Sequence, residues 1–366
     1  MNKQDWTYKK LGEVCEKASS NIAQNKIANL DGDYPVFGAS GFVQNVDFYH
    51  RETPYIGIVK DGSGVGRVNI YPAYSSLLGT MQYIIPKEGN LLGYIAYALK
   101  GLNLSSFASG AAIPHIYFKD YSKCKIPVPP LAEQERIVAE LDLLSGIIEK
   151  KKEQLKAYDQ LAQSIFYTMF GDPVTNEKGW DKSSLNKMGL LARGVSKHRP
   201  RNAPELLGGT MPLIQTGDVA NADFYIRNYT STYSELGVSQ SKIWKAGTLC
   251  ITIAATIGKC AILSFDACFP DSVVGFTVNH KLCNNEYVYF IFKCLQTILE
   301  ENAPSVAQKN INLKVLNELE LPVPPLSLQQ EFAEKVEAIE RQKALVQQSI
   351  DETQTMFDYT MDKYFG

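Results

Sequence analysis

Two glycine-containing stretches have residue types that can bind nucleotide phosphates, but neither has the spacing that this chemistry needs. Gly62, Gly64 and Gly66 form a G-x-G-x-G inside a β-branched run that predicts a hairpin, whereas a dinucleotide site places such glycines between a strand and a helix. The stretch "ATIGKC", which contains Lys259, lacks the upstream glycine of a phosphate-binding loop, and Cys260 replaces its hydroxyl residue. Neither stretch predicts a nucleotide site.

Histidines and cysteines, which commonly bind metals or act as nucleophiles, are scattered. No C-x-x-C pair occurs, and metal-ligand spacing is absent around the four histidines, His50, His115, His198 and His280. Paired carboxylates and an activated nucleophile are not apparent either. We therefore predict no metal site, no cofactor bound by this chain and no catalytic centre, and we expect a protein that recognises other molecules.

Length and composition set wider limits. A chain of 366 residues is long enough for two or three domains. Its net charge of -2 does not by itself favour a nucleic-acid partner, although the acidic excess lies in the predicted helices and leaves room for a local basic face. Seven cysteines, an odd number, with no signal peptide or long apolar span, predict a reduced, cytoplasmic, soluble protein without a membrane segment.

A long repeat organises the chain. "IPVPPLAEQERIVAELD" begins at Ile126, and "LPVPPLSLQQEFAEKVE" begins 195 residues later at Leu321. Proline geometry holds each Pro-Val-Pro-Pro run extended, and a helical pattern follows directly. Each copy therefore predicts an extended arm that stops where a helix begins.

Apolar residues in both predicted helices recur at alternating steps of four and three, the pattern of a coiled coil. Roughly 38 residues of helix at about 1.5 Å per residue give spacers about 55 to 60 Å long. The predicted helix–helix seam comprises Ile137, Leu141, Leu144, Ile148 and Leu155 in the first copy and Phe332, Val336, Ile339, Val346 and Ile350 in the second.

The helix ends carry different signals. Ser327 and Gln330 have the spacing of a capping box for the second helix, whereas Ala132 offers no cap, so we expect the first helix to fray more easily at its start. Gly171, followed by Asp172 and Pro173, predicts the end of the first helix.

The segments before each helix also repeat. Each begins near a tryptophan, Trp6 or Trp180, and each contains a predicted hairpin that carries a cation just after a glycine, in Gly66-Arg67 and Gly258-Lys259. We predict a mixed α/β (α+β) fold with an internal pseudo-twofold repeat. Its segments are a strand-rich globular unit at 1–125, a long helix at 126–171, a second globular unit at 172–320 and a second long helix at 321–366.

This organisation resembles the specificity (S) subunit of type I restriction-modification enzymes over essentially the whole chain. The resemblance rests on "IPVPPLAEQERIV" and "LPVPPLSLQQEF", each a Pro-Pro-Leu-x-x-Gln motif before a heptad helix. It implies two target recognition domains, each reading half of a split DNA sequence, and an antiparallel coiled coil as spacer. It also implies a non-catalytic subunit whose partners are double-stranded DNA, two methyltransferase subunits that bind S-adenosylmethionine, and ATP-driven restriction/translocase subunits.

Given the resemblance, basic and amide side chains of the globular units become candidate DNA contacts. The stretch "ARGVSKHRPRN" suits phosphate contacts, although a solvated surface loop explains it as well. The stretch "AQKNIN" offers amides that bond base edges. Its first-unit counterpart, "SGAAIPHIYFK", is explained almost as well by surface polarity. The candidates are Lys60, Arg67, Ser109, His115, Lys119, Arg193, Lys197, His198, Arg199, Arg201, Lys259, Gln308, Lys309, Asn310 and Asn312.

Acidic residues near the helix starts are candidates for docking a basic methyltransferase surface, but charge on a coiled coil is usually only solvation. These residues are Glu133, Glu135, Glu331 and Glu334. Two other functions remain open: a coiled-coil-spaced protein-interaction scaffold that binds no DNA, and a single-chain enzyme that methylates and cleaves. The near-neutral charge favours the first, and the missing cofactor loops disfavour the second.

Overall fold

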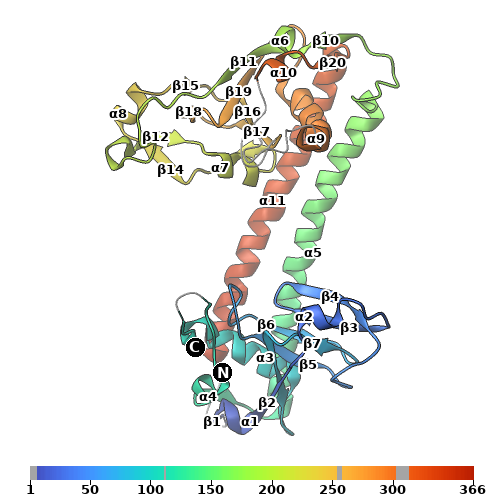
Figure 1. Ribbon diagram of the computed structural model, residues 1–366, viewed down its shortest axis with the longest axis vertical. Coiled ribbons are helices and arrows are strands. Elements are labelled where there is room, and N and C mark those ends of the chain that lie inside the picture. The colour runs from blue at the N-terminus through green and yellow to red at the C-terminus, as the bar shows by residue number, and fades with distance from the viewer. Residues whose placement is uncertain (1–5, 111–112, 254–257, 302–312) are drawn as a thin grey trace. The chain divides into compact units, whose positions relative to one another are not determined.

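The computed structural model describes residues 6–110, 113–253, 258–301 and 313–366 (Figure 1). The chain divides into two compact units: unit 1 is Met1–Glu153 with Gln347–Gly366, and unit 2 is Gln154–Val346. Two helices of 40 residues, α5 (Leu131–Phe170) and α11 (Leu326–Phe365), each contribute a part to both units. The predicted long helices are confirmed, and each unit contains a section of both.

Unit 1 contains two sheets and a strand pair. The four-stranded sheet has the order β2-β8-β5-β6 (Cys15–Ser19, Met81–Pro86, Tyr55–Val59, Val68–Tyr71), the three-stranded sheet has the order β4-β3-β7 (Gly41–Val46, Tyr34–Gly38, Ser76–Leu77), and β1 (Thr7–Lys10) pairs with β9 (Lys125–Val128). Its short helices are α1 (Leu11–Val14), α2 (Gln24–Ile27), α3 (Leu92–Gly101), the 3-10 turn Leu104–Phe107 and α4 (Phe118–Tyr121).

Unit 2 repeats this plan with additions. Its sheets have the orders β11-β19-β16-β17-β13 (Gly189–Arg193, Val273–Val278, Leu249–Thr252, Cys260–Leu263, Tyr225–Ile226) and β14-β12-β18-β15 (Ser231–Tyr233, Leu207–Leu213, Ala267–Cys268, Ile243–Trp244), and β10 (Lys182–Ser184) pairs with β20 (Glu320–Pro322). Its helices are α6 (Leu185–Met188), the 3-10 turn Pro204–Leu206, α7 (Thr216–Asn221), α8 (Glu235–Ser239), α9 (Asn285–Glu301) and α10 (Leu313–Asn317).

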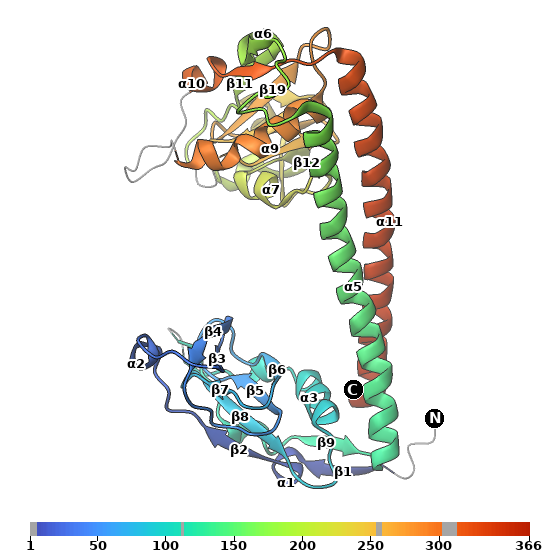
Figure 2. The same ribbon diagram turned by 90° about the vertical axis from the view of Figure 1, so that its right-hand side faces the viewer.

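Each unit has one longer helix that joins its larger sheet to the long helices. Figure 2 shows α3 between the β2-β8-β5-β6 sheet and the lower part of α5, and α9 beside the upper part of α5. The core of unit 1 accordingly combines Ile56 of β5, Tyr94 of α3 and Ile137 of α5. The core of unit 2 combines Leu249 of β16 and Phe290 of α9 with residues of both long helices. The long helices therefore help to build the domain cores as well as connect them.

Within each unit the sections of α5 and α11 pack antiparallel. In unit 1, Tyr364 donates to Glu140 (2.6 Å), and Lys151 donates to Ser349 (2.5 Å). In unit 2, the rings of Phe166 and Phe332 lie 5.6 Å apart, and Lys343 contacts Asp159. As residue numbers rise along α5, those of the partners on α11 fall. The predicted antiparallel pairing is confirmed.

The predicted seam residues are distributed along these helices. Eight of them are buried, and Leu155 and Val346 are half-buried. Ile137 and Leu141 lie in the core of unit 1, whereas Phe332, Val336 and Ile339 lie in the core of unit 2. The heptad pattern therefore includes residues that also pack against the globular parts.

The prediction of a capping box at Ser327 and Gln330 is wrong. Helix α11 begins at Leu326, so Ser327 lies inside it. The carbonyl of Pro325 accepts the N–H groups of Leu328 and Gln329, and the carbonyl of Pro130 accepts the corresponding pair at the start of α5. Both helices therefore begin in the same way, and the structure gives no basis for the expected difference in fraying. The predicted end at Gly171 is confirmed, because α5 stops at Phe170 and Gly171 has φ +76°.

A buried glutamine explains the last position of each Pro-Pro-Leu-x-x-Gln motif. In unit 1, Gln134 accepts from the Leu91 N–H (2.9 Å) and donates to the carbonyls of Gly89 and Pro129. In unit 2, Gln329 accepts from the Asn284 N–H (3.1 Å) and donates to the carbonyls of Leu282 and Pro324. Both side chains are fully buried. Each glutamine fastens the start of a long helix to the loop before α3 or α9.

Two tyrosines make a second matched connection. The hydroxyl of Tyr94 in α3 donates to the Pro127 carbonyl (2.8 Å), and that of Tyr287 in α9 donates to the Pro322 carbonyl (2.8 Å). Both side chains are fully buried, and burial raises the pKa of each hydroxyl. The proline arms are thus fixed to the same helix in each unit. Among the described residues, none of the helices is long and apolar enough to cross a membrane.

Candidate nucleic-acid interface

The predicted hairpins are confirmed, and they place cations at matched positions. Strand β5 pairs antiparallel with β6, and β16 pairs antiparallel with β17. Just before the second strand, Gly66 (φ +88°) donates to Val59 and Gly258 (φ +77°) donates to Thr252. The next residue in each hairpin is Arg67 or Lys259, whose backbone carbonyl closes the bend. Glycine is favoured here because other residues rarely adopt positive φ.

In unit 1 residues 109–110 and 113–117 lie against this hairpin. The N–H of Ile116 donates to the Lys60 carbonyl (3.0 Å), and the N–H of Gly62 donates to the Pro114 carbonyl (3.0 Å). Ser109 and His115 exchange two backbone hydrogen bonds of 2.9 Å. Lys60 therefore lies at one site with Ser109 and His115, two candidates that are distant from it in the sequence.

Charged and aromatic side chains surround His115 in this site. Its Nδ1 atom is hydrogen-bonded to Asp61, and its ring centroid lies 4.1 Å from that of Tyr117. The ammonium group of Lys60 lies 4.0 Å from the other Asp61 oxygen. Lys119, on α4, places its ammonium 5.1 Å from the centre of the Tyr117 ring. The side chain of Arg67 donates to the Gly64 carbonyl and is exposed.

The side chain of Ser109 contacts the backbone of His115 and not its ring. The hydroxyl of Ser109 donates to the backbone carbonyl of His115 (3.4 Å) and has no hydrogen bond to its ring. Among the described residues, the hydrogen-bond and ring contacts of the His115 side chain are with Asp61 and Tyr117, so Ser109 is not activated by the ring. Within the described ranges, no cluster of three or more His, Cys, Asp or Glu side chains is arranged to hold a metal ion.

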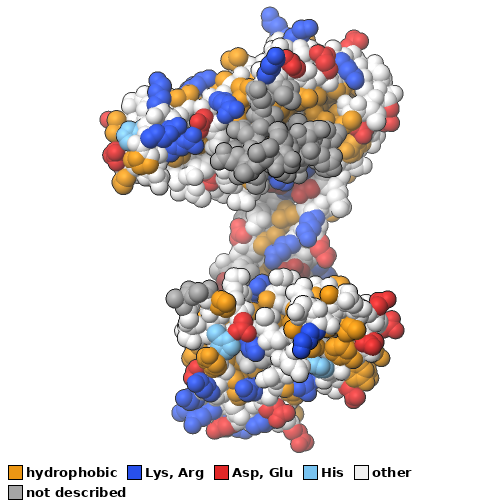
Figure 3. Space-filling model, viewed as in Figure 1, with side chains coloured by type: hydrophobic (Ala, Val, Ile, Leu, Met, Phe, Trp, Pro, Cys, Tyr) orange, Lys and Arg blue, Asp and Glu red, His pale blue; other side chains and the backbone are white. Residues whose placement is uncertain are grey.

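In unit 2 the basic loop is organised by one carboxylate. Arg201 forms an ion pair with Asp271 (2.5 Å), the guanidinium of Arg199 lies 4.0 Å from the same carboxylate, and Arg193 donates to the Asp271 backbone carbonyl (3.3 Å). Three arginines thus converge on a single acid, which leaves an excess of positive charge. Figure 3 shows Lys and Arg side chains gathered at the end of unit 2 that carries α8.

Of the remaining candidates of unit 2, some have described contacts and others lie outside the described residues. The backbone N–H groups of Lys197 and His198 donate to the side-chain oxygen of Gln240, and the His198 ring lies 3.9 Å from Glu205. Four predicted base-reading residues lie outside the described residues: Gln308, Lys309, Asn310 and Asn312. The partners Asp61, Asp271 and Gln240 were missed from the sequence, because each is distant in the chain from the residues it holds.

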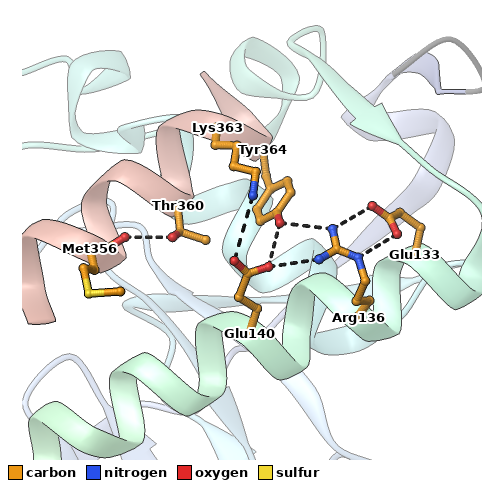
Figure 4. A network of polar contacts seen from close by, with 7 residues as sticks. All are labelled: Glu133, Arg136, Glu140, Met356, Thr360, Lys363 and Tyr364. Atoms are coloured by element: carbon orange, nitrogen blue, oxygen red, sulfur yellow. Dashed lines mark hydrogen bonds and ion pairs between the residues drawn. The ribbon is translucent and has the colours of Figure 1, made fainter. Parts of the chain in front are cut away.

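Of the four acidic residues proposed for docking, two are already paired. Figure 4 shows Glu133 bound to Arg136, which also contacts Glu140 and Tyr364. The hydrogen bond from Arg136 lowers the pKa of Glu133. Glu331 pairs with Lys335 (3.1 Å), whereas Glu135 and Glu334 are exposed.

Comparisons with known proteins agree with this architecture. The family model described as type I restriction modification DNA specificity domain matches residues 3–157 and 177–354. The EcoDI type I restriction enzyme specificity subunit of Escherichia coli is 23% identical over 376 residues, which cover 92% of this chain and 81% of that protein. The putative MjaX specificity subunit of Methanocaldococcus jannaschii is 23% identical over 269 residues, which cover 69% of this chain but 59% of that protein.

A solved structure extends the likeness to the whole fold. The crystal structure of the type I restriction-modification S subunit from M. genitalium has a TM-score of 0.63 and 16% sequence identity, and the match covers 99% of this chain and 96% of that one. At this identity the likeness concerns the fold alone. With the family model matching both globular segments and most of both long helices, the chain belongs to the type I restriction modification DNA specificity domain family.

Proposed function

We propose that this chain is the DNA-recognition subunit of a type I restriction-modification complex. Each globular domain reads one half of a bipartite, asymmetric DNA site, with unread bases between the halves. The observation that carries the proposal is the duplicated hairpin: both units place a cation at the same position after a glycine of positive φ. Family membership supports the same reading.

The charge distribution suits DNA despite the net charge of -2. In unit 1, Lys60, Arg67 and Lys119 lie on or beside the hairpin. In unit 2, Arg199 and Arg201 share the Asp271 carboxylate and Arg193 bonds only the Asp271 backbone carbonyl, so the basic loop retains charge for phosphates. Lysine and arginine that neutralise phosphates supply most of the sequence-independent affinity for DNA.

The proposed partners supply the chemistry. In this proposal the chain is non-catalytic and holds two methyltransferase subunits, which bind S-adenosylmethionine, and restriction/translocase subunits, which use ATP. Surfaces of α5 and α11 that remain exposed, including Glu135 and Glu334, are available for such docking. The seven cysteines, all free thiols, suit the reducing conditions of the cytoplasm, where we place the complex.

Binding to duplex DNA at several salt concentrations tests the proposal. The chain is purified with its methyltransferase subunit, and binding to a mixture of duplexes is measured by fluorescence anisotropy from 50 to 200 mM salt, a range over which about six to ten phosphate contacts weaken binding about 10³- to 10⁵-fold. We expect a steep fall in affinity with salt and selective retention of a subset of sequences. Absence of duplex binding at the lowest salt would instead favour the protein-interaction scaffold.

A further inference from the structure

The His115–Asp61 pair in unit 1 is positioned by backbone hydrogen bonds at both residues. His115 is fixed by two backbone hydrogen bonds to Ser109, and the neighbouring Ile116 is bound to Lys60. Asp61 is fixed by its own N–H, which donates to the Thr80 carbonyl (3.2 Å). The side chains of His115 and Asp61 are each 28% exposed. Both halves of the pair are therefore positioned by backbone contacts from three separate segments.

The carboxylate determines which ring nitrogen of His115 carries the proton. A carboxylate oxygen only accepts hydrogen bonds, so Nδ1, which is bonded to Asp61, must be the protonated nitrogen of the neutral ring. In this neutral form of the ring, Nε2 is a hydrogen-bond acceptor. Within the part of the chain that the structure describes, Nε2 has no hydrogen-bond partner, while Tyr117 packs against the ring.

We propose that Nε2 of His115 reads a base edge in the DNA half-site of unit 1, and that Asp61 is the positioning residue that makes it an acceptor. This inference rests on the proposed function. In the major groove the exocyclic amino groups of adenine and cytosine are the donors, whereas guanine and thymine present acceptors. His115 therefore selects adenine or cytosine over guanine or thymine at one position of one strand. Lys60 and Lys119 flank the pair and contact phosphates.

Asp61→Asn tests the inference because it removes the acceptor-only group without changing the shape. An amide can donate to Nδ1, which moves the proton to Nε2 and turns it into a donor; replacing the carboxylate of a His–Asp pair by an amide traps the wrong tautomer in serine proteases. We expect the base preference to change at one position only. At that position the preference for adenine or cytosine should fall about tenfold, and the preference for guanine or thymine should rise. A change of this size corresponds to one base-edge contact.

The measurement is methylation of a randomised duplex library by the complex with its methyltransferase subunits, followed by sequencing of the modified sites. The half-site read by unit 2 is the internal control and should be identical in every variant. Asp31→Asn is the matched control, because Asp31 is an exposed carboxylate of the same unit whose side chain bonds the N–H of Gly32. It removes the same charge and should leave both halves of the motif unchanged.

A second variant covers the case in which Asp61→Asn prevents folding. His115→Gln replaces the ring by an amide that both donates and accepts, so the same position should become tolerant of all four bases. An unchanged base preference with a uniform loss of affinity in either variant would overturn the inference, because it would make His115 a phosphate or structural contact. A wild-type complex that methylates no split motif would instead overturn the proposed function itself.

Discussion

At the scale of single residues, the most informative side chains are buried polar groups at matched positions. Gln134 and Gln329 each make three hydrogen bonds with no exposed surface, and they join the start of a long helix to a loop of the globular part. A buried donor or acceptor that loses its partner is costly. The glutamine of the Pro-Pro-Leu-x-x-Gln motif therefore has a structural role, because its side chain is hydrogen-bonded within its own unit.

Gln134→Ala should therefore destabilise unit 1. The substitution leaves the Leu91 N–H and the Gly89 and Pro129 carbonyls without their partner, so we expect a loss of about 1 to 3 kcal/mol in the free energy of unfolding. Urea denaturation followed by circular dichroism measures it. Gln154→Ala, at an exposed position of the same helix, is the control and should change little. Equal free energies of unfolding for the two variants would show that the Gln134 hydrogen bonds do not stabilise unit 1.

Residue-level prediction from sequence was only partly possible. The cations of both hairpins could be identified because each follows a glycine in a β-branched run. Asp61 could not be assigned as the partner of His115, nor Asp271 as the partner of Arg201, because the residues of each pair lie 54 and 70 positions apart. Such pairing depends on tertiary contacts that local residue patterns do not encode.

At the scale of elements, a charged cluster joins both long helices to the strand-rich part of unit 2. Lys343 of α11 binds Asp159 of α5, Asp223 just before β13 and Glu340 one turn earlier. Arg227 lies 3.5 Å from Glu340. Burial disfavours the charge of Lys343, but the hydrogen bonds to Asp159 and Asp223 and the charge of Glu340 outweigh this and raise the pKa of the ammonium group.

Lys343→Met should destabilise unit 2 because Glu340, with 8% of its side chain exposed, loses its nearest cation. We expect a loss of about 3 kcal/mol, the low end for breaking a buried ion pair, since Asp159 and Asp223 remain partly solvated. Denaturant unfolding of both proteins measures the difference. Lys335→Met, which removes an exposed ion pair from the same helix, is the control and should cost less than about 1 kcal/mol.

The stabilisation of unit 2 by Lys343 should decrease at high pH. A raised pKa means that the folded state binds the proton more tightly than the unfolded state, whose ordinary value is 10.5. The stabilisation by Lys343 is therefore complete below pH 10.5 and is lost as the pH rises through the raised pKa. The difference between wild type and Lys343→Met should be equal at pH 7 and pH 9 and should shrink above about pH 10.5.

Among the elements, periodicity predicted the long helices and the hairpins but not α3 and α9. The long helices carry many heptads, and proline marks their starts. In α3, six of the ten residues are buried, so its apolar residues cover most of its surface and give no one-sided pattern. The capping-box prediction failed because the Pro-Pro-Leu run starts the helix before Ser327, and local capping signals do not reveal which of two nearby starts is used.

At the scale of the whole molecule, the chain uses its C-terminal end to complete its first unit. Tyr364 is fully buried in the core of unit 1, and its ring lies 6.3 Å from that of Trp6. In unit 2 the corresponding tryptophan, Trp180, donates to the carbonyl of Phe170 at the end of α5 (2.8 Å). Each globular part thus begins with a tryptophan against the end of a long helix. The sequence repeat predicted a pseudo-twofold organisation, whereas the contacts of Trp6 and Trp180 with the helix ends are found only in the structure.

The central claim is that two domains of one chain read two halves of one DNA site. The most direct measurement is to purify the chain with its methyltransferase subunit, treat DNA with the complex and S-adenosylmethionine, and map the methylated adenines. We predict a split motif of two short, different halves separated by a constant number of unread bases. A complex that methylates a single continuous motif, or no DNA at all, would contradict the account.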